Sequence, residues 1–214
     1  MRAVNERVRV KKEGSRYHHG NLRDALVLAA ERAIAKSQNV HLPLREVAKL
    51  AGVSHAAAYR HFDSKAALLA EVAVKGFAAL TARITGAASK GRTPQARFVE
   101  AGVSYVSFAL ESPGAFRVMF DASLKPFTRF PGLSEAAFGA LSELHRVLRA
   151  GVTAGVFRGD DLDGSVMTAW STIHGHATLL LDEQFVGPFS VSSDGAVASA
   201  RLVIRRLVDG LRVR

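Results

Sequence analysis

The sequence has 214 residues, of which 48% are hydrophobic and 22% charged, a composition typical of a folded protein. It contains no cysteine, which excludes disulfide bonds, thiolate metal sites and a cysteine nucleophile. Residues 1–85 carry 15 basic and 7 acidic side chains, a net charge of +8, whereas residues 86–214 carry 14 and 12, a net charge of +2. This asymmetry predicts that the N-terminal part meets a polyanion and that the remainder has another task.

No segment has the pattern of a membrane or secreted protein. The apolar runs are all shorter than the roughly 18 residues that a membrane-spanning helix needs. The first residues are rich in basic side chains and do not lead into the apolar core of a signal peptide. We therefore expect a cytoplasmic protein with no membrane partner.

Residues 1–16 have the composition of a flexible basic arm. They lack apolar periodicity and carry six basic side chains against two acidic ones. Such an arm can reach into the minor groove of DNA or run along its phosphates, and the alternative is a solvated tail without a partner. The candidate contacts in the arm are Arg9, Lys11, Lys12 and Arg16.

Four helices are predicted between the arm and residue 85. Apolar residues recur at helical spacing over about 21–36, and a polar loop follows. Pro43 can begin a second helix that stops at Gly52, and Ser54 can cap a third helix running to about residue 61. Asp63 or Ser64 can cap a fourth helix of about 20 residues.

The remainder of the chain also has a helical pattern. A break at Gly86 and the polar segment 90–94 predict a domain boundary. Helices are expected over about 94–110, 113–120, 134–154 and 164–185, and a last one from its N-cap Asp194 to the end of the chain. No segment combines alternating polarity with flanking turn signals, so the fold class is all-α with about nine helices.

Residues 44–62 have the spacing of a helix-turn-helix. Ala48 is small where two helices must cross closely, and Gly52 permits the turn between them. Val47, Val53 and Ala58 can fill the space between the helices. The first turn of the third helix lacks bulk, which suits insertion into the major groove, and Lys65 at the next helix N-terminus suits a phosphate. The predicted outer face comprises Ser54, His55, Ala56, Ala57, Tyr59, Arg60 and His61.

Four segments resemble the DNA-binding domain of the TetR family of repressors: 17–22 (YHHGNL), 44–48 (LREVA), 51–54 (AGVS) and 59–62 (YRHF) followed by Lys65. The resemblance implies a DNA-binding domain over 17–64, a connecting helix over 65–85 and a ligand-binding and dimerisation domain over 86–214. It implies phosphate contacts for Tyr59, His61 and Lys65. It also implies contacts with bases or nearby phosphates for Arg45, His55, Ala56, Ala57 and Arg60. Pro43 departs from the family pattern, in which Thr or Ser often caps the second helix and touches phosphate.

A second resemblance covers the C-terminal part. Residues 113–120 (PGAFRVMF) and 170–175 (WSTIHG) are similar to a C-terminal subtype of the same family. It implies that the last two helices pair with those of a second subunit, and that a ligand pocket lies among the preceding helices. Candidate pocket residues are Phe98, Tyr105, Phe108, Phe116, Met119, Phe120, Trp170 and His174. Candidate dimer contacts are Trp170, Val197, Ala200, Ile204, Leu207 and Leu211, for which packing within one subunit is the alternative.

Two histidine pairs raise the question of a metal or hydrolytic site. His18 and His19 are adjacent and their side chains diverge, so phosphate contact or helix capping is the better interpretation. His174 and His176, near Asp182 and Glu183, point about 200° apart on a helix and share no ligand face. We therefore expect no metal and no cofactor.

The sequence as a whole predicts a homodimeric, ligand-responsive repressor of a roughly palindromic double-stranded DNA operator, associated with the bacterial nucleoid when bound. Its ligand is an unknown small molecule. One alternative is a non-specific architectural DNA-binding protein, suggested by the charge. Another is a metal-dependent enzyme that uses His174 and His176.

Overall fold

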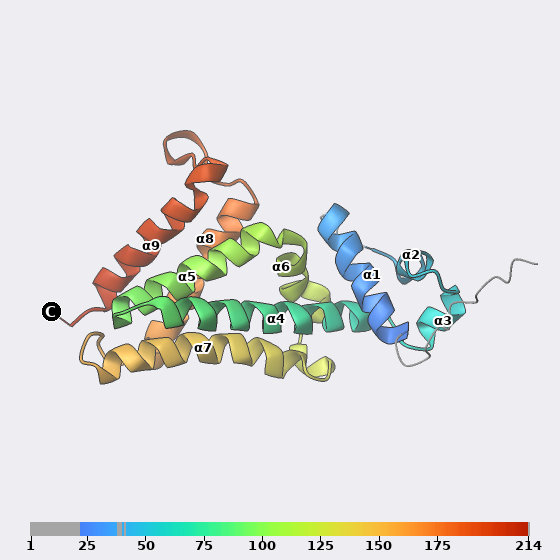
Figure 1. Ribbon diagram of the computed structural model, residues 1–214, viewed down its shortest axis with the longest axis horizontal. Helices are drawn as coiled ribbons and strands as arrows, with labels where there is room; N and C mark the ends of the chain where they lie inside the picture. The colour runs from blue at the N-terminus through green and yellow to red at the C-terminus, as the bar shows by residue number, and fades with distance from the viewer. Residues whose placement is uncertain (1–21, 38–39, 41, 214) are drawn as a thin grey trace, which may run out of the picture.

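The computed structural model describes residues 22–37, 40 and 42–213. These residues form nine α-helices, four short 3-10 turns and no β-strand, so the all-α prediction is confirmed. The contacts predicted for Arg9, Lys11, Lys12 and Arg16 lie outside the described residues, as do those of His18 and His19. The first three helices lie at one end of the molecule, and the remaining six described helices form the rest (Figure 1).

The first three helices are α1 (Leu22–Ser37), α2 (Leu44–Leu50) and α3 (His55–Tyr59). Helix α1 buries Leu26, Ala30 and Ile34, a stripe at four-residue spacing that packs towards α4. The turn between α2 and α3 passes through Gly52 at a φ of +70°, a left-handed conformation that glycine adopts at little cost. The role predicted for Gly52 is therefore confirmed.

Helix α4 (Lys65–Lys90) runs from the α1–α3 group into the centre of the C-terminal part (Figure 1). It begins at Ser64, whose hydroxyl accepts a hydrogen bond from the Ala67 amide at 3.1 Å. The break predicted at Gly86 is wrong, because Ala88 continues the buried stripe of α4. A single exposed glycine costs a helix only about 1 kcal/mol, which this packing outweighs.

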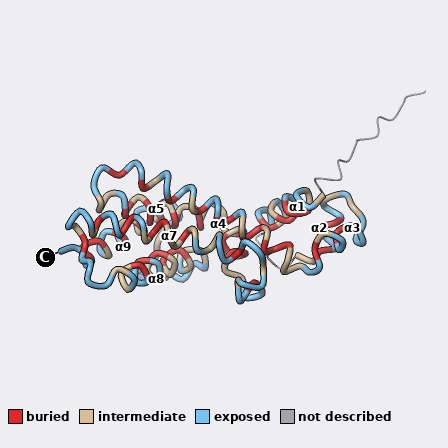
Figure 2. Tube along the Cα trace, turned by 90° about the horizontal axis from the view of Figure 1, so that it is seen from below, coloured by how far each residue is buried: buried red, intermediate tan, exposed pale blue. Residues whose placement is uncertain are grey.

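Five further helices complete the fold: α5 (Pro94–Glu111), α6 (Pro113–Met119), α7 (Leu133–Thr153), α8 (Leu162–Leu181) and α9 (Ala196–Leu211). Helix α5 is central, in contact with α4, α6, α7, α8 and α9. The buried residues follow the inner sides of these helices (Figure 2). Helix α8 ends four residues earlier than predicted, where Glu183 adopts a φ of +52°. Asp194 does not cap α9, since it lies in a 3-10 turn that Ser192 caps.

Helix α6 joins the C-terminal helices to α1 through a close approach at Gly114. A Cβ atom built on Gly114 would lie 2.7 Å from the Ile34 side chain and 2.9 Å from the Ile34 carbonyl oxygen. Because one of these neighbours is backbone, α1 and α6 can approach this closely only with glycine at this position.

We predict that Gly114→Ala lowers the free energy of unfolding by about 1 to 3 kcal/mol, the usual cost of overpacking. Urea denaturation measures this change. Gly139→Ala is the control, because nothing lies within 4 Å of a Cβ built at Gly139. It should leave stability unchanged or raise it by up to about 1 kcal/mol. Equal effects of the two substitutions would contradict the close contact.

Candidate nucleic-acid interface and ligand cavity

Helices α2 and α3 form a helix-turn-helix held by backbone and cap hydrogen bonds. The Val53 amide donates to the Ala48 carbonyl at 3.0 Å, which closes the turn. The Ser54 hydroxyl accepts from the Ala57 amide at 3.1 Å and caps α3. Val47 and Ala58, predicted to fill the space between the helices, are buried, as is the small residue Ala48. Val53, predicted to fill the same space, is half-buried.

Most of the predicted outer residues lie on the surface. Arg45, His55, Ala56, Tyr59 and Arg60 are exposed, and His61 and Lys65 are half-buried. The His55 and Tyr59 rings contact each other edge to face, with centroids 4.6 Å apart. Ala57 was predicted on the outer face, but it is only 8% exposed, because it lies with Ala58 on the inner side of α3.

Arg23 of α1 connects the end of α3 to α4, a role that the sequence analysis missed. Its guanidinium lies 4.5 Å from the centre of the buried Phe62 ring. The same group donates to the His61 carbonyl at 3.0 Å and to the Glu71 carboxylate at 2.6 Å. Arg23 therefore fixes the chain that leaves α3 through three contacts with groups distant in sequence.

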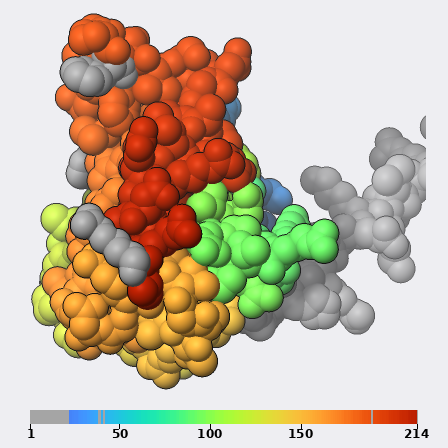
Figure 3. Space-filling model, turned by 90° about the vertical axis from the view of Figure 1, so that its left-hand side faces the viewer, coloured from blue at the N-terminus to red at the C-terminus, as the bar shows by residue number. Residues whose placement is uncertain are grey.

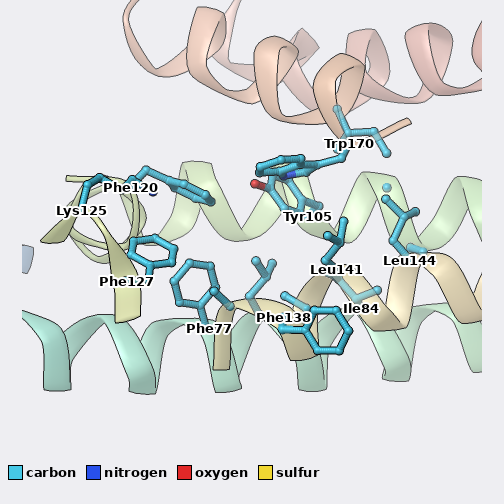
Figure 4. Close-up of a pocket in the computed structure, with 16 residues that line it drawn as sticks. Phe77, Ile84, Tyr105, Phe120, Lys125, Phe127, Phe138, Leu141, Leu144 and Trp170 are labelled. Atoms are coloured by element: carbon cyan, nitrogen blue, oxygen red, sulfur yellow. The ribbon is translucent and has the colours of Figure 1, made fainter. Parts of the chain in front are cut away.

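A cavity of about 280 Å³ lies between α4, α5, α7 and α8 (Figure 4). Aromatic side chains cluster towards one end, where Phe120, Phe127 and Lys125 come from the segment after α6, and Phe77 comes from α4 (Figure 4). Leu144 of α7 lies towards the other end. Such a largely apolar, partly enclosed space is typical of a small-molecule site.

Three aromatic side chains with polar atoms, Tyr105, His174 and Trp170, lie together at the wall of the cavity. The Tyr105 hydroxyl lies 2.8 Å from Nδ1 of His174. Burial, assisted by the charge of Lys125, lowers the pKa of His174, so the ring is mostly neutral at pH 7 and Nδ1 can accept from the hydroxyl. Burial raises the pKa of Tyr105, and a hydrogen bond with Trp170 opposes that rise only in part.

Three of the eight residues predicted for the pocket line this cavity: Tyr105, Phe120 and Trp170. His174 stands behind Tyr105. The other four lie elsewhere, because an aromatic residue type does not reveal which side of its helix faces the cavity. Phe98 packs on Phe157, and Phe108 lines a second cavity between α1, α4, α5 and α6. Phe116 lies against Tyr105 and His174, and Met119 packs on Gly76.

Several lining residues of the cavity were not predicted from the sequence. Phe77 was assigned only to a connecting helix, whereas α4 is a wall of the cavity. Phe138, Leu141 and Leu144 recur at spacings of three on α7, and this amphipathic pattern was the available signal. Lys125 lies in a segment without periodicity, which carried no signal at all.

The predicted dimer contacts are divided between core and surface. Ala200, Ile204 and Leu211 are buried within the subunit, because this face of α9 packs on α5. The prediction that these three residues contact a second subunit is corrected, because a core residue offers no surface to a partner. Leu207 is half-buried, whereas Val197 and Trp170 are exposed.

His174 and His176 point to different helices. Nε2 of His176 lies 3.1 Å from the Ser199 hydroxyl of α9, whereas His174 bonds to Tyr105 of α5. Asp182 pairs instead with Arg117 at 3.2 Å. Within the described residues, no three histidine or acidic side chains are grouped as metal ligands would be. No described helix combines the length and apolar character needed to cross a membrane.

The exposed helix-turn-helix and the long helix that joins it to a helical, cavity-containing domain define a DNA-binding regulator. Residues 25–72 match the bacterial regulatory proteins of the tetR family, and residues 98–207 match the tetracyclin repressor-like C-terminal domain. The chain belongs to the TetR family of transcriptional regulators.

Solved structures show the same fold. A protein of unknown function from Rhodococcus sp. RHA1 is 31% identical, with a TM-score of 0.77 over 94% of this chain and 100% of that one. A tetR-family regulatory protein from Rhodococcus RHA1 is 19% identical, with a TM-score of 0.67 over 90% and 98%. FadR from Bacillus subtilis, in complex with stearoyl-CoA, is 19% identical, with a TM-score of 0.68 over 88% and 99%. No curated protein matches the sequence.

We predict that Arg23→Gln accelerates hydrogen exchange of the α3 amides and lowers the free energy of unfolding by about 1 kcal/mol. The reason is the loss of a cation–π contact and of charge-assisted hydrogen bonds. Arg32→Gln removes the same charge from an exposed position of the same helix and should change neither quantity. Unchanged α3 exchange in the Arg23 variant would contradict this role.

Proposed function

We propose that the chain is a homodimeric repressor that a small-molecule ligand releases from a roughly palindromic operator. The proposal rests on the position of α4, which begins beside the helix-turn-helix and also forms a wall of the cavity. One rigid element thus belongs to both sites. We call the group of helices α1 to α3, which holds the helix-turn-helix, the reading head. A ligand that changes the packing around α4 changes the position of the reading head.

The proposed DNA contacts follow from which side chains α2, α3 and the start of α4 leave exposed. Tyr59 and Lys65 can reach phosphates, the latter beside free amides at the α4 N-terminus. Arg45 on α2 can reach a base edge in the major groove. The basic arm would add phosphate contacts and make the affinity depend steeply on salt.

We predict that Tyr59→Ala and Lys65→Ala each weaken binding to every duplex by about 1 to 2 kcal/mol, because each removes a phosphate contact that carries no sequence information. Arg45→Ala should also change the relative affinities for operators with single base changes. Fluorescence anisotropy with duplexes selected from a random pool measures both effects.

Arg92→Ala is the control for charge, because Arg92 follows the far end of α4. It should leave the affinity nearly unchanged. Unaltered relative affinities in the Arg45 variant would refute base reading by this residue. Similar affinity of the wild-type protein for all duplexes at fixed salt would favour a non-specific architectural protein.

The proposed dimer surface lies on α8 and α9, which are exposed at the end remote from the helix-turn-helix (Figure 3). Met167 is 67% exposed on α8 and Leu202 is 59% exposed on α9. Ser171 and Gly175 lie on the same face of α8 as Met167, so this face has little bulk at its centre. Exposed apolar side chains grouped on packed helices are typical of a surface that a partner covers.

We predict that Gly175→Arg converts the dimer to a monomer, because it places a long charged side chain in the centre of that surface. The monomer itself should remain folded, since nothing lies within 4 Å of a Cβ built at Gly175. Gly86→Arg is the matched control, being an equally uncrowded helical glycine on α4. Analytical ultracentrifugation should show a dimer for wild type and Gly86→Arg. A Gly175 variant that stays dimeric would place the interface elsewhere.

The ligand step is supported by the path from the cavity to the reading head. Phe120 follows α6 directly and lines the cavity, while Gly114 at the start of α6 packs on Ile34 of α1. The stearoyl-CoA complex of FadR is a precedent for a small molecule in this fold. A footprint upstream of the protein's own gene, lost when an effector is added, would support operator release. The absence of any protected site there would count against repression of its own gene.

A further inference from the structure

We propose that the cavity takes an apolar carboxylate, whose anionic head lies on Lys125 and whose body extends between α4, α5 and α7 towards Leu144. This inference rests on the proposed function only in taking this cavity as the effector site. It adds the chemical class of the effector.

Lys125 is a cation placed for a ligand's anionic head. Its Nζ lies 3.6 Å from the centre of the Phe127 ring, which holds the ammonium at the end of the cavity. None of the ion pairs among the described residues includes Lys125. The nearest acid in sequence, Asp121, bonds to the amide and hydroxyl of Ser123 and does not line the cavity.

Lys125 is exposed overall, but its ammonium has lost part of its hydration, and this partial burial lowers its pKa. A carboxylate bound at Nζ would replace that hydration with a charge-assisted hydrogen bond. A cationic ligand would add repulsion at the same place.

The other walls match an uncharged body. Lys125 is the one formally charged residue among those that line the cavity, because Tyr105 stays protonated and the remainder are apolar or aromatic. Phe77, Phe120 and Phe127 lie at the end that holds Lys125 (Figure 4). Ile84, Leu141 and Leu144 lie towards the other end, together with Phe138. A volume of about 280 Å³ is near the lower limit of ligand pockets, which suits a medium-length chain or a single substituted ring.

Trp170 supplies a direct measure of occupancy, since it is the only tryptophan in the chain and lines the cavity. The probes are decanoate and 4-butylbenzoate as carboxylates, with 1-decanol and decyltrimethylammonium as neutral and cationic counterparts and decanoyl-CoA as the conjugated form. We expect the carboxylates to change the Trp170 fluorescence at concentrations at least about tenfold below those needed for 1-decanol. Lys125→Gln should remove this preference, because one charge-assisted hydrogen bond is lost.

Two further variants complete the test. Lys125→Arg keeps the charge and should retain the preference for carboxylates. Arg129→Gln removes a cation that also lies against a ring in the same segment, Phe130 at 5.5 Å, but does not line the cavity, and should bind the carboxylates as wild type does. Urea unfolding of each variant confirms that it is folded.

The proposal is overturned if neither carboxylate changes the fluorescence, if 1-decanol or the cationic probe binds as tightly, or if Lys125→Gln leaves the preference intact. Binding of decanoyl-CoA alone would assign the site to conjugates and also overturn it. Release of a labelled operator is measured separately by anisotropy. Carboxylate binding without operator release would refute the ligand-controlled function and leave the ligand class standing.

Discussion

The packing of α4 is the constraint on which the rest of the structure depends. At 26 residues this helix is about 39 Å long, so it spans most of the distance between the reading head and the far end of the subunit. Its N-terminal turns hold α1 and, through Glu71, the Arg23 contacts at the end of α3. Its middle and C-terminal turns pack on α5 and α7. Because α4 is buried along one face over this length, the packing at its two ends is joined by a single helix.

The reading head shows why part of the fold could be predicted from the sequence. Its determinants are local: Gly52 adopts the left-handed turn, and Ser54 caps the helix that follows it, as their residue types predicted. The burial of Ala57 could not be predicted in this way. A helix of five residues has no clear boundary between an inner and an outer face, and only the packing of α3 on its neighbours decides that Ala57 is buried.

The C-terminal part depends on contacts between distant segments, and prediction was weaker there. The stripe of Ala200, Ile204 and Leu211 was visible in the sequence, but a stripe does not say whether its own subunit or a second one covers it. The structure assigns it to α5 of the same subunit. In the same way, Phe98 and Phe120 are equally apolar, and only the rotation of their segments places one against Phe157 and the other at the cavity. Lys125 could not be found by any periodic pattern, because it belongs to an irregular segment.

The position of Trp170 has a consequence for the behaviour of the protein in solution. Its indole lines the cavity, yet the residue is 40% exposed at the edge of the α8 surface proposed for the dimer. A partner subunit on that surface would hold one wall of the cavity in place. By thermodynamic linkage, any effect of the partner on ligand affinity must equal the effect of the ligand on subunit affinity. The concentration of effector needed for half-saturation would then depend on the concentration of the protein itself, so that a cell could tune its sensitivity through expression level alone.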